Sequence, residues 1–257
     1  MNLIQRIGIA IFICAASGAC ADATPIVIAR TTDGFLIGTN STRSDGAQHC
    51  KIHYVGKKLL LVAGQPVDMQ IVNDATGKSD LIFDLHKDLW RVFRQVRSDK
   101  TLMDIVKTIV VKDIASNSPR SLSNGVASFN LALISTDGAE PALTTMWLEF
   151  HARNAWQPTT SINQVKLAVG QAIYWAGVDP PVLLTRVNGS TDILSILQET
   201  AKDARRQNAE QQRVDRGFEP PFIILALEPY GLRRVDGDLS VCTSAHPLPF
   251  PTPPANH

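Results

Sequence analysis

The sequence predicts an α+β fold in which antiparallel strands form two packed sheets and helices cover them. Short β-rich runs separated by turn signals occur in both halves of the chain. Amphipathic segments with helical spacing are grouped between these runs, and they do not alternate with single strands. About 230 residues remain once an N-terminal leader is set aside, which is enough for one large domain with a sizeable core.

The leader is residues 1–23, which read as a secretory signal peptide. Arg6 gives a positive start, an apolar run covers residues 7–16, and Ala21-Asp22-Ala23 has the small-x-small pattern that signal peptidase prefers. A cut after Ala21 and lipidation at Cys20 are the alternatives. We therefore expect an exported protein, periplasmic or secreted, with a lipid anchor at Cys20 as the other arrangement. No later stretch is long and apolar enough to cross a membrane, so no membrane contact is expected after signal removal.

Two strand pairs are predicted to open the folded part. Residues 26–30 and 35–39 are β-rich and flank the turn signal Thr32-Asp33-Gly34, which predicts a hairpin. Residues 51–55 and 59–63 form a second pair. The run 59–63 is apolar on both faces, which predicts a buried central strand.

Helices are predicted to follow. Gly64 is expected to end the strand before it. Apolar residues then recur at helical spacing and predict an amphipathic helix; they are Ile82, Leu85, Leu89, Val92, Phe93 and Val96. A second amphipathic segment covers residues 101–114, and residues 115–125 are rich in Ser, Asn, Pro and Gly, as in a loop.

Strands return in the second half of the chain. Residues 126–135 and 143–150 are predicted as strands joined by a turn at Asp137-Gly138, and residues 168–176 as another strand. A helix is expected from 192 to 212. Its N-cap is Ser190 or Thr191, and its buried stripe is Ile193, Ile196, Leu197, Ala201 and Ala204.

The last elements are a strand pair and a tail. Residues 222–227 are strongly apolar, and residues 232–235 are expected to pair back onto them. The folded domain is expected to span residues 24–241. Residues 242–257 form a proline-rich tail, for which an extended conformation is expected.

Charge and cysteine content exclude some functions and leave others open. The formal net charge is +1 and there is no basic block, so no nucleic-acid partner is expected. Cys50 and Cys242 are the cysteines outside the leader. In an exported protein they either form one disulfide or remain as two free thiols.

A metal site and a cofactor site are not expected. Strand alternation would place His49, Lys51 and His53 on one face and Cys50 on the other. A cation between two histidines disfavours a metal, and a fourth ligand is missing. The glycine-rich phosphate loop is absent from the sequence, which argues against nucleotide binding. The tryptophans, Trp175 among them, are interpreted as core residues.

Thr24 carries the most direct chemical implication. Cleavage after Ala23 would leave Thr24 as the first residue, with a hydroxyl nucleophile and a free amine that can act as its base. The alternative is an ordinary residue at the start of a strand, or one inside a longer N-terminus.

Several motifs resemble, in order and spacing, the proteasome β-subunit family of N-terminal nucleophile hydrolases. The resemblance spans most of residues 24–235. The motifs are Thr24 with Asp33-Gly34, Asn40 and Thr42-Arg43; the strand Lys51-Ile52-His53-Tyr54-Val55; Ala63-Gly64-Gln65-Pro66-Val67-Asp68; and the segment from Glu219-Pro220-Pro221-Phe222 to Arg233-Arg234.

This resemblance implies a four-layer αββα sandwich and hydrolysis of an amide or peptide bond by a threonine-type peptidase. Thr24 would be the nucleophile, Lys51 its electrostatic partner, and Gly64, at the opening of the first helix, the oxyanion donor. Asn40 takes the place of the family's aspartate, and Asp215 that of a supporting aspartate. No cofactor is implied. The family assembles into rings, so homo-oligomerisation is an associated expectation.

The chain departs from the family pattern at positions close to the implied site. Asn40 lacks the charge of the aspartate that it replaces, and Phe218 lacks a hydroxyl where the family has serine. Pro25 follows the implied nucleophile and removes one backbone donor. These departures favour an alternative function, a non-catalytic protein that keeps the fold for a binding or structural role.

Overall fold

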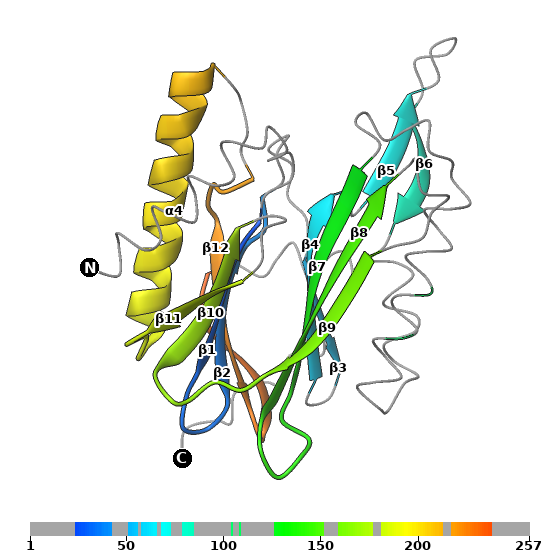
Figure 1. Cartoon of the computed structure of the whole chain (residues 1–257). Coiled ribbons are helices and arrows are strands. Elements are labelled where there is room, and N and C mark those ends of the chain that lie inside the picture. The colour runs from blue at the N-terminus through cyan, green and yellow to red at the C-terminus, as the bar shows by residue number, and fades with distance from the viewer. Residues whose placement is uncertain are drawn as a thin grey trace.

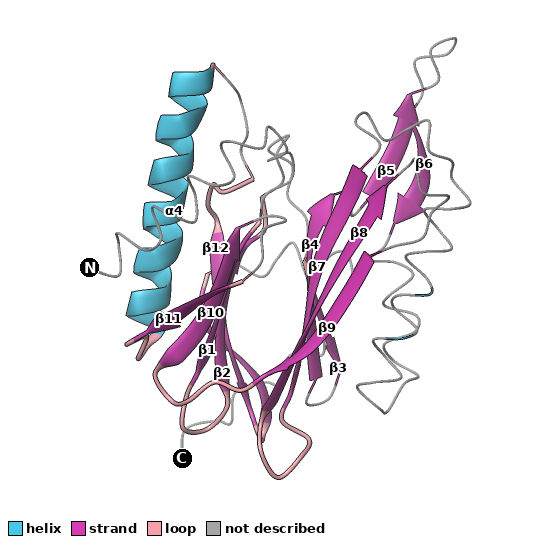
Figure 2. Cartoon of the chain, in the orientation of Figure 1, coloured by secondary structure: helices cyan, strands magenta, loops and turns pink. Residues whose placement is uncertain are grey.

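The computed structural model describes residues 24–42, 51–55, 58–65, 68–72, 79–84, 104, 108, 126–151, 159–176, 181–212 and 217–237. This part of the chain has a mixed α+β fold with antiparallel sheets and one long helix, which confirms the predicted class (Figures 1 and 2). The leader, the C-terminal tail and both Cys50 and Cys242 lie outside the described residues. No described helix is long and apolar enough to span a bilayer.

A six-stranded sheet joins the two ends of the described chain. Every neighbouring pair in it is antiparallel. Its strands, in spatial order, are β11 (Val182–Thr185), β10 (Gln171–Ala176), β1 (Pro25–Arg30), β2 (Phe35–Asn40), β12 (Phe222–Glu228) and β13 (Gly231–Asp236). The hairpin β1–β2 and the closing pair β12–β13 therefore confirm two sequence predictions.

A five-stranded antiparallel sheet faces the first one (Figure 1). Its strands, in spatial order, are β3 (Ile52–Val55), β4 (Lys58–Gln65), β7 (Val126–Ser135), β8 (Ala142–His151) and β9 (Thr159–Val165). As predicted, β4 lies inside the sheet, between β3 and β7. A separate two-stranded sheet consists of β5 (Asp68–Val72) and β6 (Ser79–Asp84).

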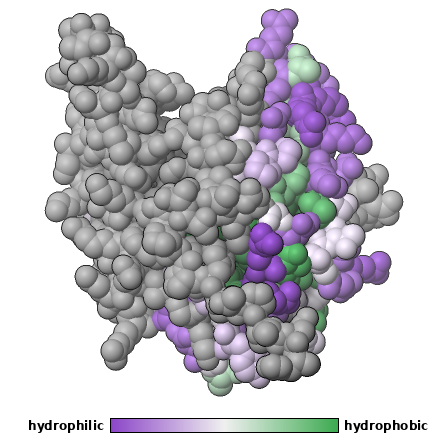
Figure 3. Space-filling view, turned by 180° about the vertical axis from the view of Figure 1, so that it is seen from behind, coloured by the Kyte–Doolittle hydropathy of each residue, from purple (hydrophilic) through white to green (hydrophobic). Residues whose placement is uncertain are grey.

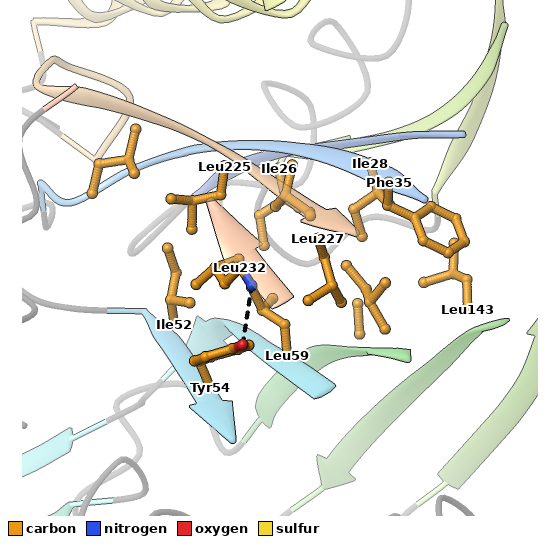
Figure 4. Packing of buried hydrophobic residues seen from close by; sticks show 14 of the residues in the cluster. Ile26, Ile28, Phe35, Ile52, Tyr54, Leu59, Leu143, Leu225, Leu227 and Leu232 are labelled. Carbon is orange, nitrogen blue, oxygen red and sulfur yellow. Dashed lines mark hydrogen bonds between the residues drawn. The ribbon is translucent and has the colours of Figure 1, made fainter. Parts of the chain in front are cut away.

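Strand alternation builds the core between the two large sheets. On β1, Ile26 and Ile28 point toward the five-stranded sheet, whereas Val27 and Ala29 point the other way. Leu59 from β4 belongs to the same inter-sheet cluster. Figure 4 shows Ile26, Ile28 and Leu59 meeting between the sheets. A hydrogen bond also joins the two sheets: the Tyr54 hydroxyl on β3 accepts from the backbone N–H of Leu232 on β13 at 3.0 Å (Figure 4).

The helix α4 (Ser190–Gln211) packs on the opposite face of the six-stranded sheet. It buries the apolar stripe that the sequence predicts. The approach is close at Gly38, where an added Cβ would lie 2.2 Å from Cγ2 of Ile193. The hydroxyls of Tyr174 and Thr200 form a buried contact of 3.1 Å across this interface. Seen from behind, hydrophilic residues cover much of the described surface on the side where α4 lies (Figure 3).

The predicted cap of this helix is wrong, by one residue for Ser190 and by two for Thr191. The N-cap is Gly189, and neither Ser190 nor Thr191 occupies that position. Instead, the Asp192 carboxylate in the first turn accepts from the backbone N–H of Asn188 at 2.8 Å. A carboxylate in this first turn also complements the positive end of the helix dipole.

The outer face of the five-stranded sheet is also buried. Leu131, Leu133 and Met146 lie on the face opposite the inter-sheet cluster, and each is only 1% exposed. The outer face is therefore buried over β7 and β8, whereas Ile162 of β9, which pairs with Met146 on the same face, is exposed.

The predicted start of the first helix is wrong. Gly64 does not end the strand, because β4 continues to Gln65, and β5 and β6 follow it. Ile82 lies in β6, although the sequence interpretation placed it on a helix. The apolar run Leu81-Ile82-Phe83 is too short for its spacing to distinguish a strand from a helix. Residues 85–103 lie outside the described part. Within the predicted second helix, Asp104 and Thr108 have helical backbones, and the Thr108 hydroxyl donates to the Asp104 carbonyl at 2.8 Å.

The strand predicted over residues 168–176 is shorter in the structure. β10 begins at Gln171, and residues 166–170 form the connection from β9. The sequence interpretation missed β9, whose residues are largely polar and whose Ile162 is exposed, because it lacks a buried apolar face. It also missed the short edge strand β11.

Candidate active site at one end of the two sheets

Thr24 lies at the beginning of β1, a strand inside the six-stranded sheet. It is 4% exposed. By strand alternation its side chain shares a face with Ile26, the face that lines the inter-sheet core. The β1–β2 register pairs Ile26 with Thr39, and continuing it by two residues brings Thr24 opposite Ser41. Thr24 therefore lies at the end of the sheet where β2 finishes.

Lys51 reaches the same end from the opposite sheet. It directly precedes β3 of the five-stranded sheet and is buried. Its ammonium donates to Oδ1 of Asn40 at 3.1 Å and to the backbone carbonyl of Thr42 at 2.9 Å. Both acceptors belong to the segment that ends β2. The Lys51 side chain thus spans the two sheets next to the cross-strand neighbours of Thr24.

Asn40 uses both ends of its amide. It is fully buried, and its Nδ2 donates to the carbonyls of Gly217 at 2.7 Å and Glu219 at 2.9 Å. Its Oδ1 accepts from Lys51, which can only donate. These partners fix the orientation of the amide. The position requires one acceptor and two donors on the same side chain, and asparagine supplies them.

The segment before β12 is held along its backbone by the end of β2. Besides the two contacts of Asn40, the Thr42 hydroxyl donates to the Pro220 carbonyl at 2.9 Å, and the Ser41 N–H donates to the Pro221 carbonyl at 3.3 Å. The peptide bond between Pro220 and Pro221 is cis. Phe218 points away from these contacts into the apolar cluster beneath α4.

Thr24, Asn40 and Lys51, three of the five predicted site residues, share one end of the two facing sheets, and the backbone of Gly64 lies toward the same end of the five-stranded sheet. Gly64 does not open a helix; it lies in β4 and pairs with Phe129 of β7. The prediction that Gly64 is an oxyanion donor at the start of a helix is therefore wrong, because Gly64 lies in a strand. Asp215 lies outside the described residues.

The histidines and cysteine considered for a metal site are only partly described. His49 and Cys50 lie outside the described residues, and the backbone of His53 belongs to β3. In the described part of the chain, no three His, Cys, Asp or Glu residues are grouped closely enough to hold a metal ion.

Sequence reasoning missed the carbonyl groups of residues 217–221 as the other half of this site. Backbone carbonyls carry no sequence signature. The one signal that could have marked this segment is the Pro220-Pro221 pair directly before the predicted strand 222–227. The site thus contains a buried ammonium that donates to the Asn40 and Thr42 oxygens, at the sheet end where the buried Thr24 lies. A cation held in this way favours the deprotonated form of groups near it.

No model of a known protein family matches this chain, and no curated protein matches it either.

Proposed function

We propose that this chain is an exported N-terminal nucleophile hydrolase of the proteasome β-subunit type, which cleaves an amide or peptide bond with Thr24. The observation that carries the proposal is the Lys51 ammonium, bound to Asn40 and Thr42 at the sheet end where β1 begins. In the family that the sequence resembles, a lysine at this place assists an N-terminal threonine. The signal-peptide pattern before Thr24 supports the same assignment.

The proposed reaction uses two groups of one residue. The Thr24 hydroxyl oxygen attacks the amide carbonyl carbon, and its proton passes to the α-amine of Thr24, directly or through a water molecule. The carbon–nitrogen bond breaks, the leaving amine takes the proton, and an ester remains on Thr24. Water then hydrolyses the ester and regenerates the hydroxyl. Lys51 assists by electrostatic stabilisation of the deprotonated forms.

The proposed architecture is the four-layer αββα sandwich. The helix α4 and the two packed sheets account for three layers. Burial of Leu131, Leu133 and Met146 on the outer face of the five-stranded sheet supports a fourth covering layer.

The second candidate is a non-catalytic protein that keeps this fold for binding. Asn40 favours it, because the amide gives Lys51 an uncharged partner and binds the carbonyls of Gly217 and Glu219. In such a protein, Lys51 and Asn40 would hold the end of β2 against the segment before β12 and would have no role in catalysis. The two candidates differ in one property, the reactivity of the Thr24 hydroxyl.

Two measurements test the proposal. The intact mass of the exported protein should correspond to a chain that begins at Thr24; a chain that begins at Asp22, or one lipidated at Cys20, contradicts the catalytic assignment. The mature protein should then form an ester adduct with a β-lactone, which adds its full mass when the ring opens.

The labelling needs matched variants. Thr24→Ala should give no adduct, whereas Thr24→Ser keeps a hydroxyl and should still be labelled. Absence of an adduct on a chain that does begin at Thr24 would favour the binding protein.

A further inference from the structure

Trp175 carries a buried donor that no described residue accepts from. It lies near the end of β10, is 2% exposed and belongs to the inter-sheet cluster. Its indole Nε1–H finds no hydrogen-bond acceptor among the residues that the structure describes. Leaving such a donor unpaired costs the full desolvation penalty of the N–H group, so buried donors of this kind are rare in folded proteins.

The register places this donor beside Thr24. Trp175 pairs with Ile26 across the β10–β1 ladder, and paired residues point to the same face of a sheet. Thr24 precedes Ile26 by two residues, so it shares that face and is the diagonal neighbour of Trp175. Diagonal neighbours lie about 7–8 Å apart at the backbone, within reach of an aromatic side chain.

The three groups form one end of the inter-sheet space. Lys51 approaches from the five-stranded sheet, while Thr24 and Trp175 belong to adjacent strands of the six-stranded sheet. On this face Trp175 has the apolar neighbours Ile26, its partner on β1, and Ile173, two residues before it, while Thr39 on β2 is a further polar residue beside Ile26. In such surroundings a single N–H donor selects for a ligand with an acceptor at the matching place.

We infer that Trp175 is a substrate-binding residue whose indole N–H donates to a carbonyl oxygen of the amide substrate held at Thr24. The inference rests on the proposed function and names the chemical group that the site recognises. It also explains why this buried donor has no acceptor in the described part of the chain. Phenylalanine would fill the apolar surroundings without an unpaired N–H, but it could not bind that carbonyl.

The test uses N-acetyl-trialanine aldehyde and the mature protein labelled with 15N at its tryptophan indoles. The Thr24 oxygen adds reversibly to the aldehyde carbon and the proton passes to the former aldehyde oxygen, so both an adduct and a dissociation constant can be measured. The chain has four tryptophans, hence four indole N–H resonances. We expect the Trp175 resonance to move downfield on binding, because its N–H gains an acceptor.

Tryptophan variants identify the Trp175 resonance and measure how much the indole N–H contributes to aldehyde binding. The Trp175 resonance is the one absent from Trp175→Phe, or the one left after Trp90→Phe, Trp147→Phe and Trp156→Phe if Trp175→Phe does not fold. Loss of one hydrogen bond should weaken aldehyde binding about tenfold in Trp175→Phe. Tyr230→Phe, which also removes a polar group from an aromatic ring but at an exposed turn, should leave binding unchanged.

The outcomes separate the inference from the proposed function. If the aldehyde adds to Thr24 and the Trp175 resonance stays where it is, the inference is overturned and the hydrolase assignment stands. A resonance that is already downfield in the free protein and does not move points to a bound water, and overturns it equally. If no aldehyde adds to a chain that begins at Thr24, both proposals fail together.

Discussion

Replacing Asn40 by aspartate should destabilise this protein, although it restores the charge found in the family that the sequence resembles. In the parent, Nδ2 donates to two carbonyls at 2.7 and 2.9 Å. A carboxylate would place an oxygen against those carbonyl oxygens. The substitution therefore exchanges one buried and one partly buried hydrogen bond for two repulsive contacts.

The magnitude follows from comparing the lost and gained interactions. Losing the Asn40 donor costs ~1–3 kcal/mol at each carbonyl, so the pair costs about 2–6 kcal/mol. The new carboxylate would attract Lys51 at 3.1 Å with about 5 kcal/mol at an effective dielectric constant of ~20. Removing a carboxylate from water costs several kcal/mol, which offsets that attraction. We expect a net loss of about 2–5 kcal/mol in the free energy of unfolding, dominated by the two carbonyls.

Urea unfolding monitored by tryptophan fluorescence measures this loss. The control is Asn163→Asp, the same chemical change at an exposed asparagine whose Nδ2 donates to the Ser161 hydroxyl at 2.9 Å. It should change stability by no more than about 0.5 kcal/mol. If Asn40→Asp is as stable as the parent, Nδ2 does not hold the carbonyls of Gly217 and Glu219, and the reasoning about this site is refuted.

Three further predictions concern the site and the helix. Lys51→Met should abolish β-lactone labelling of Thr24 while the protein stays folded by circular dichroism, since the cation is the electrostatic partner of the nucleophile; full labelling would remove Lys51 from the mechanism. Tyr174→Phe should cost about 1 kcal/mol in urea unfolding, because it removes the bond to Thr200, whose hydroxyl still donates to the Ile196 carbonyl; no loss would mean that the bond contributes nothing. Gly38→Ala should cost about 1–3 kcal/mol by overpacking against Ile193, whereas Gly138→Ala, with 3.5 Å to the nearest contact, should be nearly neutral. Equal stabilities for these two variants would argue against a close approach of α4.

The parts of the fold that could be predicted have strong local signals. The hairpin β1–β2 is marked by Asp33-Gly34, and Gly34 is required there because an added Cβ would lie 2.0 Å from the Leu227 carbonyl oxygen. The apolar stripe of α4 is equally direct. The segment after Gly64 has no such signal: apolar runs as short as Leu81–Phe83 satisfy strand and helix patterns alike, and pairing with β5 decides the outcome.

The site was predictable to the extent that its residues carry chemistry in their side chains. Thr24, Asn40 and Lys51 could be named from residue type and order. The role of Asn40 could not, because its donors bind backbone carbonyls about 180 residues away, and such contacts leave no pattern in a sequence. The unused indole N–H of Trp175 was equally hidden, since the same residue type is also an ordinary core residue.

The connectivity of the six-stranded sheet constrains how the chain reaches its native state. β1 and β2 pair with each other at once, but their remaining neighbours, β10 and β12, come from the far end of the sequence. The sheet therefore closes only after nearly all of the polypeptide has been synthesised, and its high contact order predicts slow folding. A nascent polypeptide would keep β1 without its partner β10, and β2 without β12, until late in synthesis. Truncation before β12 would leave β2 with an open edge, the kind of surface that seeds aggregation.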